Sequence, residues 1–406
     1  MSMMTPDRFA RLAALKPSRK RAVEAAARGV APDIPAGAAR LAEILGAATQ
    51  RNRYGEHLAL RRWFSEAPGC EPSACAPEGE LDAGGLEVEQ FFMREHSEEH
   101  SLLVALAERM AERRVLVTFN GKSFDWPLLE TRYRMTRRIR PPTPRAHLDF
   151  LHPARNLWRL RLGSVRLAEL EKHVLGWNRG VDVMSELIPD IYFNFVRGGP
   201  AEPLVPVFHH NQMDLRGLAG LSGRILSMLA EPEDSGQGAN QMDALELYGV
   251  SRICERRGQA NRARNLYQRS IASELPPETD RAARRSLARL AKRGGDLSLA
   301  RELWEGMLGG SKEGLEAYEQ LAIYYEHHAR EPHRAAGVAR KALAELRRAN
   351  RLGTMAAAAY RLCRERFEHR LARLERKAGR SLLDAMESES RLGSGESNGQ
   401  GKQPGD

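Results

Sequence analysis

The chain has 406 residues, of which 42% are hydrophobic, and this is enough material for two or three domains. A formal net charge of +10 favours nucleic acid or another polyanion as a partner. No apolar run approaches the roughly 18 residues of a membrane helix, no signal peptide is evident, and the four cysteines lack zinc-site spacing, so we expect a cytoplasmic protein with reduced thiols.

The first part of the chain shows few regular patterns. Residues 1–75 are rich in Ala and Arg and are expected to be helical or irregular, with a short helix over 38–46. Residues 66–85 are dense in Pro, Gly and small residues, which is typical of a loop. Alternating apolar and polar residues then predict a strand over 86–93, and an amphipathic pattern predicts a helix over 98–113.

Two short strands follow, and each ends in polar residues. The β-branched run over 115–119 stops at a polar turn, and a helix begins near Pro127. Asp125 at that helix start is either an N-cap or a metal ligand. A second strand over 146–151 carries Asp149. The alternation of strands and helices predicts an α/β architecture with parallel pairing.

A long helix over 203–226 places histidines and an acid near one another. His209 and His210 lie five and four residues before Asp214, so they approach its helical face. With Asp125, these residues suit two-metal phosphodiester hydrolysis, in which carboxylates hold two ions and a histidine acts as general base. Mg²⁺ or Mn²⁺ suits carboxylate ligands.

From about residue 240 the pattern becomes purely helical. An Ala-x-x-Leu-aromatic pattern begins at Ala263 and Ala300 and returns in altered form at Ala335, with offsets of 37 and 35 residues. This resembles tetratricopeptide-type hairpins, whose period is about 34 residues, and the alternative is an ordinary helical bundle. We therefore expect an all-α, tetratricopeptide-like repeat domain over 240–375 and a disordered tail over 387–406.

Two motifs in the α/β part resemble those of a known enzyme family. The pattern Asn120-x-x-x-Phe124-Asp125 resembles the second motif of the DEDD-type 3′–5′ exonucleases, which have a ribonuclease H-like fold. The pattern His209-x-Asn211-x-x-Asp214 resembles their third motif. The order of motifs over residues 86–226 is similar to that of the YprB-like branch of bacterial predicted exonucleases. The resemblance implies a ribonuclease H-like domain over 76–230.

The resemblance also implies roles for individual residues. Asp125 and Asp214 would be ligands of Mg²⁺ or Mn²⁺, and His209 would be the general base. His210 is the alternative base, since it has the spacing at which the tyrosine subfamily carries its tyrosine. Single-stranded DNA or RNA would be the partner, and the residues expected to contact it are Asn120, Lys122, Phe124, Asp149, Arg132 and Arg138. The arginines have a second interpretation, as the solvated face of a helix.

The first motif of that family, Asp-x-Glu on the first strand, is missing here. Glu78-x-Glu80-x-Asp82 has the spacing but lies among glycines without an apolar run. We expect that the segment with the first one or two strands is lost and that metal binding is weakened. Two functions remain open: a catalytically impaired, metal-dependent exonuclease-like protein that binds nucleic acid, or a non-catalytic scaffold whose repeats bind a protein partner.

Overall fold

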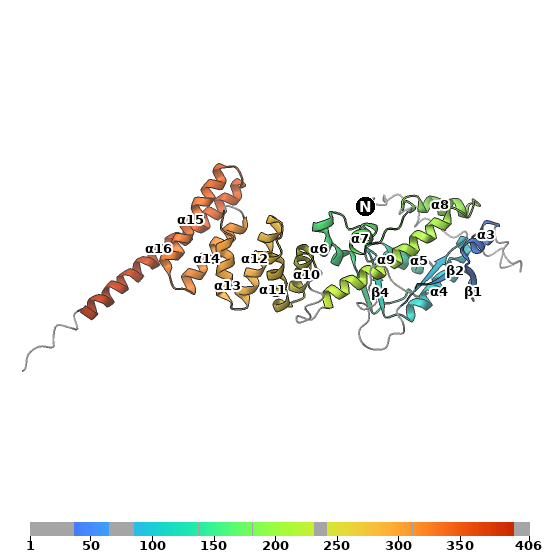
Figure 1. Ribbon diagram of the computed structural model, residues 1–406, viewed down its shortest axis with the longest axis horizontal. Helices are drawn as coiled ribbons and strands as arrows, with labels where there is room; N and C mark the ends of the chain where they lie inside the picture. The colour runs from blue at the N-terminus through green and yellow to red at the C-terminus, as the bar shows by residue number, and fades with distance from the viewer. Residues whose placement is uncertain are drawn as a thin grey trace, which may run out of the picture. The chain divides into compact units, whose positions relative to one another are not determined.

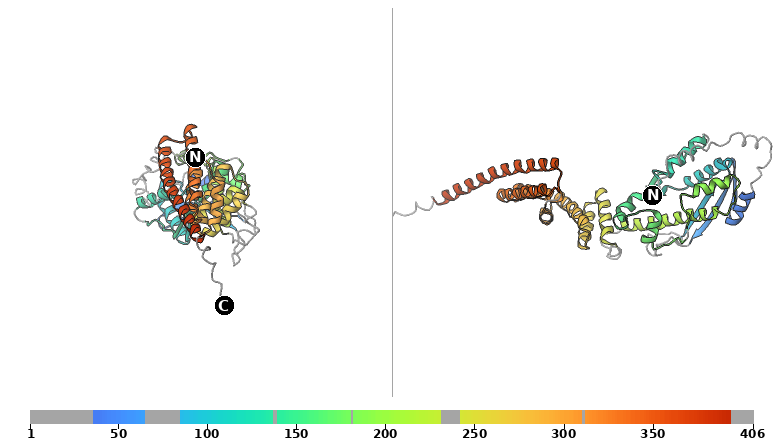
Figure 2. Two further views of the ribbon diagram at one scale, coloured as in Figure 1. Left: turned by 90° about the vertical axis from the view of Figure 1, so that its left-hand side faces the viewer. Right: turned by 90° about the horizontal axis from the view of Figure 1, so that it is seen from above.

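The computed structural model describes residues 36–64, 85–136, 139–180, 182–230, 242–309 and 312–393. The chain divides into two compact units, Met1–Gln241 and Met242–Asp406. The first unit combines helices with two small sheets, and the described part of the second consists of helices joined by turns (Figures 1 and 2).

The first unit begins with an antiparallel sheet. Strand β2 lies between β1 and β3, so that Ala59 is opposite Ala48 on one side and Phe91 on the other. Leu58 and Leu60 of β2 are buried in a hydrophobic cluster that also holds Phe208. The elements of this region are α3 (Ala36–Leu45), β1 (Ala48–Asn52), β2 (Gly55–Phe64) and β3 (Leu86–Phe92).

This sheet corrects one expectation. The prediction of a helical or irregular segment over residues 1–75 is wrong for β1 and β2, although α3 lies close to the helix expected over 38–46. Strands therefore do exist before Leu86. Neither β1 nor β2 contains an Asp-x-Glu pair, and the candidate acids over 78–82 lie outside the described residues. The central apolar run of β2, residues 58–60, is short because it lies between Glu56-His57 and Arg61-Arg62, so this run alone does not predict a strand.

A separate, parallel sheet carries the candidate site. It consists of β4 (Val115–Thr118) and β5 (Ala146–Asp149), in a register that places Thr118 opposite Asp149. Val115, Val117 and Leu148 on these strands remain 48%, 37% and 42% exposed. This is unusual, because parallel sheets are normally covered on both faces.

The described part of the first unit contains six further α-helices and a short 3-10 helix over His96–Glu98. The two that flank β4 are close to their expected ranges, whereas α8 has no counterpart in the sequence prediction. Helix α9 packs against β3, where the ring of Phe208 lies 5.0 Å from that of Phe92. The helices are α4 (Glu99–Ala111), α5 (Asp125–Thr136), α6 (Leu151–Leu162), α7 (Leu167–Val174), α8 (Ile188–Val196) and α9 (Leu204–Ala230).

The second unit is mostly helical, and its described residues contain no strand. Each helix packs on the next, and the short connections make neighbouring helices antiparallel. Ala263, Ala300 and Ala335, which begin the sequence pattern, are fully buried. The helices are α10 (Ala244–Arg256), α11 (Ala260–Ala272), α12 (Pro277–Arg293), α13 (Leu297–Gly306), α14 (Lys312–His327), α15 (Pro332–Arg351) and α16 (Ala357–Gly393).

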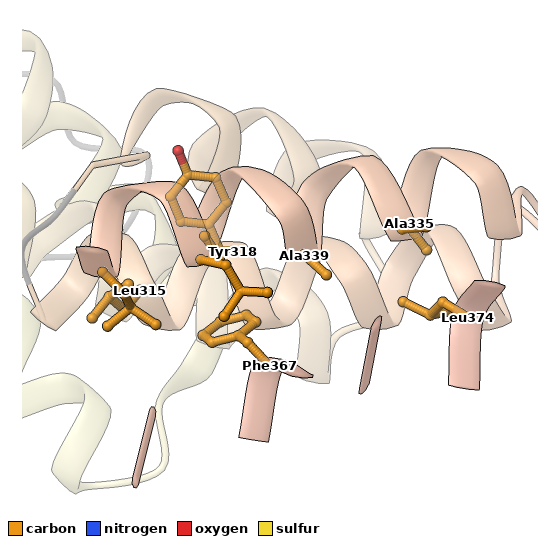
Figure 3. Packing of buried hydrophobic residues seen from close by; sticks show 10 residues of the cluster. Leu315, Tyr318, Ala335, Ala339, Phe367 and Leu374 are labelled. Carbon is orange, nitrogen blue, oxygen red and sulfur yellow. The ribbon is translucent and has the colours of Figure 1, made fainter. Parts of the chain in front are cut away.

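The last three helices share one hydrophobic core. Tyr318 of α14, Ala335 and Ala339 of α15, and Phe367 and Leu374 of α16 meet there (Figure 3). The small alanines of α15 allow the larger side chains of its neighbours to approach closely. Helix α16 extends to Gly393, so the prediction of a disordered tail is wrong for residues 387–393.

No described helix is both long and apolar enough to cross a membrane.

Candidate active site

The turn between β4 and α5 fixes the position of Asp125. Asn120 adopts a left-handed backbone with φ of 69°. A Cβ atom at Gly121 would lie 2.5 Å from Cβ of Thr118, so only glycine fits there. The Trp126 amide donates a 2.8 Å hydrogen bond to the Gly121 carbonyl, and α5 begins at Asp125.

Asp149 clamps this turn to the end of β5. Its carboxylate accepts hydrogen bonds from the backbone amides of Asn120 (2.8 Å), Lys122 (3.0 Å) and Leu151 (3.1 Å). Partial burial alone would raise the pKa of this carboxyl, but the three amide donors lower it. Both carboxylate oxygens therefore accept hydrogen bonds from the main chain. Asp149 stabilises the turn, at a position where we expected contact with nucleic acid.

Asp125 lies within electrostatic range of two other acids. Desolvation raises its pKa, and the negative charges of Asp149 and Asp214 raise it further. Asp125 is itself exposed to solvent. The structure thus places Asp125, Asp149 and Asp214 near enough for their charges to interact.

The two candidate histidines of α9 have different surroundings. His209 is exposed to solvent. His210 is largely buried, and its Nδ1 lies 2.8 Å from a carboxylate oxygen of Asp182. Its Nε2 lies 3.6 Å from Asp214, too far for a good hydrogen bond. Of the two, only His210 has a ring orientation fixed by an acid and turned toward Asp214.

A buried arginine holds the acids of this region together. The Nη2 atom of Arg179 lies 2.6 Å from Asp214 and 2.5 Å from Glu171, and its Nη1 lies 3.3 Å from Asp182. The side chains of Arg179 and Glu171 are only 7% and 0% exposed. A Cβ at Gly217 of α9 would lie 1.7 Å from Glu171, so the glycine makes room for the acid between α7 and α9.

The charges in this network favour an ionised arginine. Burial alone would lower the pKa of Arg179, but its bonds to Glu171 and Asp214 outweigh that effect and raise it. For Glu171 the desolvation dominates and raises the pKa, although Arg179 opposes it. Sequence analysis missed Arg179, Glu171 and Asp182. One readable signal exists, because Glu171 follows Leu167 and Leu170 on the apolar face of α7.

The described acids do not make a complete two-metal site. No group of three or more His, Cys, Asp or Glu residues among the described residues is arranged to hold a metal ion. Asp149 accepts three backbone amide hydrogen bonds, and Asp214 is paired with Arg179. Asp125 is exposed, and the side chain of Asp214 is 39% exposed. The described donor set therefore does not fit two divalent ions.

The residues expected to contact nucleic acid differ in their exposure and in their partners. Lys122 is exposed, Phe124 is half-buried beside it, and Asn120 shapes the turn. Arg132 instead forms an ion pair with Glu99, and both side chains are largely buried, so its charge is neutralised within the fold. Arg138 lies outside the described residues.

Comparisons with known proteins agree with this geometry. Residues 79–226 match a family model described as the RNase_H superfamily, so this part of the chain is an RNase H-like domain. Members of that superfamily typically use divalent metal ions. The uncharacterized protein YprB of Bacillus subtilis (strain 168) is 32% identical over 269 residues, which are 64% of this chain and 60% of that protein. The chain thus spans less than two thirds of its relative. No solved structure matches it.

Proposed function

We propose that the chain is a 3′–5′ exonuclease-like protein that binds nucleic acid but whose metal-dependent catalysis is impaired. The observation that carries the proposal is the pairing of Asp214, an expected metal ligand, with Arg179. The RNase H-like domain supports a nucleic-acid-related function, and the acids near Asp125 supply the remains of a hydrolytic site.

The ion pair between Arg179 and Asp214 opposes metal binding, because the positive guanidinium lies against the carboxylate that would bind the ion. A divalent ion at Asp214 would meet the positive guanidinium 2.6 Å from the same carboxylate. Displacing Arg179 would leave Glu171 buried without its cation, and breaking a buried ion pair in this way costs about 3–5 kcal/mol. Bound Mg²⁺ or Mn²⁺ would have to offset that cost before it could supply Lewis-acid chemistry.

The exposed sheet supports the loss of a strand with the first motif. In a ribonuclease H-like sheet a further strand would border β4 and bring an Asp-x-Glu pair to Asp125. Here β4 pairs with β5 alone among the described strands, and Val115 and Val117 remain exposed. Such a pair of parallel strands is what remains when a neighbouring strand is removed.

A bound metal ion would be held by Asp125 and Asp214. As the general base we propose His210 in preference to His209. Asp182 fixes the Nδ1 atom of His210, which leaves Nε2 directed toward Asp214. A histidine held by a carboxylate in this way is oriented to accept a proton from water. His209 has the spacing of the family motif but is exposed.

Two assays separate chemistry from binding. Degradation of single-stranded DNA and RNA should be weak or absent in Mg²⁺ or Mn²⁺, whereas oligonucleotide binding should persist and weaken as salt increases. The matched control is Asp125→Ala, which should leave binding unchanged. Vigorous degradation that Asp125→Ala abolishes would show that an acid outside the described residues completes the site, and would overturn the proposed impairment.

The second candidate is a scaffold whose helices bind a protein partner. The repeated alanines at 263, 300 and 335 are all fully buried, which supports a tetratricopeptide-like array. Such arrays offer an extended concave surface to their ligands. Wild-type protein that binds no oligonucleotide at any salt concentration would favour this candidate.

A further inference from the structure

Three hollows in the second unit meet along helix α12. They have volumes of about 960, 380 and 430 Å³. Arg285 lines the first and the second, while Arg289 and Arg293 line the second and the third. Because these side chains are shared, the hollows are neighbours, and we call them together the α12 groove. It runs from α10 past α12 to α14 and α16.

The groove carries more positive charge than its acids neutralise. Glu255 is shared by Arg289 at 2.7 Å and Arg293 at 3.4 Å, and these two arginine side chains are 52% and 61% exposed. Glu319 is likewise shared by Arg366 and Arg370. Each of these carboxylates thus faces two cations, which leaves a net positive charge open to solvent.

The basic character of the whole chain is concentrated in this unit. Residues 242–406 contain 31 Lys and Arg against 23 Asp and Glu, a net charge of +8. Residues 1–241 contain 32 and 30, a net charge of +2. The RNase H-like unit therefore has little electrostatic attraction of its own for a polyanion, and the helical unit supplies most of it.

The spacing of the cations suits a ligand with regularly repeated charges. Arg285, Arg289 and Arg293 follow one another every four residues, so they lie about 6 Å apart along one face of α12. Tyr248 and Trp304 also line the groove but are buried, so they are not free to stack on bases. The chemistry of the groove thus favours contact with phosphates and not with bases.

We propose that the α12 groove binds the phosphate backbone of nucleic acid. This inference rests on the proposed function, which supplies nucleic acid as the ligand of the chain, and it places the principal attraction in the helical unit. The RNase H-like unit would then act on, or hold, a strand that the helical unit has captured.

The test compares two double variants of the full chain. Arg289→Gln with Arg293→Gln removes two groove charges. Arg334→Gln with Arg340→Gln removes two arginines of similar exposure and similar ion pairing that line none of the three hollows. Binding of a mixed-sequence, single-stranded oligonucleotide is measured by fluorescence anisotropy over a range of salt concentrations, and thermal melting confirms that both variants fold.

The groove variant should bind at least fivefold more weakly at low salt. Its plot of log K against log salt should be shallower by about 1.4, since each lost phosphate contact on a single strand contributes about 0.7. The control variant should retain the wild-type slope.

Four results would overturn the proposal. Equal losses in both variants would assign the binding to general charge. If the wild type binds and both variants bind equally well, the groove is not the binding site, and only this inference is overturned. If the wild type does not bind at all, the proposed function is overturned too. Polyglutamate that competes better than the oligonucleotide would identify an acidic peptide as the ligand.

Discussion

At the scale of single residues, the carboxylate of Asp149 stabilises the backbone around the candidate site. It joins the ends of β4 and β5 by accepting amide hydrogen bonds from Asn120 and Lys122 of the β4–α5 turn and from Leu151 just after β5. Asn120 can stay in its left-handed conformation because its amide is held by this carboxylate. The position of Asp125 therefore depends on the hydrogen bonds that Asp149 accepts from this turn.

We predict that Asp149 makes stability depend on pH on the acid side. Its folded pKa is lowered, so its stabilisation is present above the unfolded pKa of about 3.9 and is lost as the pH falls through the folded value. Asp149→Asn should lower the free energy of unfolding at pH 7 and remove part of the decline at acid pH. Urea denaturation from pH 7 down to 3 measures both. Parallel curves for wild type and variant would contradict the assignment.

At the scale of elements, the close packing of α7 on α9 depends on a missing side chain. Gly217 lies in the middle of α9, where glycine normally weakens a helix. In return, the glycine leaves space for the side chain of Glu171. Glu171 binds Arg179 and Arg179 binds Asp214, so this space also determines where these two residues lie. Tertiary packing here outweighs helix propensity.

We predict opposite effects for two helical glycines. Gly217→Ala should destabilise the first unit by about 1–3 kcal/mol, because its methyl group overlaps a side chain already held by Arg179. Gly337→Ala in α15 meets no atom within 4 Å and should stabilise the second unit by up to about 1 kcal/mol through helix propensity. Thermal melting reports both. A neutral Gly217→Ala would show that α7 and α9 can separate without cost.

Elements with a strong local pattern could be predicted from the sequence. The run over 115–119 and the turn after it are recognisable because a β-branched segment stops abruptly at polar residues, and β4 with α5 follows that pattern. The short apolar run of β2 lies between polar and charged residues, and its strand character comes from pairing with β3. In the network of Arg179 only Glu171 carries a sequence signal, because the partners of Arg179 come from three separate segments and meet only through tertiary contacts.

At the scale of the whole molecule, the candidate-site acids and most of the net charge lie in different units. Asp125, Asp149 and Asp214 are in the first unit, while most of the net positive charge is in the second. Under the proposed function, affinity for a polyanion does not require a complete metal site, because phosphate attraction depends on arginines and not on bound ions. Loss of catalysis and loss of binding are therefore separable.

We predict that divalent metal ions do not change the stability of the wild-type fold. A ligand that binds only the folded state at 100 times its dissociation constant stabilises it by about 2.7 kcal/mol. Because Arg179 already neutralises Asp214, the melting temperature of the wild type should be the same in Mg²⁺ and in EDTA. Arg179→Ala should melt at a lower temperature, since it leaves Glu171 buried without its cation.

The same variant should also become responsive to metal. Without the guanidinium, Asp182 and Asp214 lose the cation that lies between them, and Mg²⁺ or Mn²⁺ in that space would relieve their repulsion. Divalent ions should therefore raise the melting temperature of Arg179→Ala more than that of the wild type, and Arg179→Lys, which keeps a positive charge, should respond less. A wild-type melting temperature that rises in Mg²⁺ and loses this rise in Asp125→Ala would instead reveal a working metal site, in which Arg179 gives way to the ion.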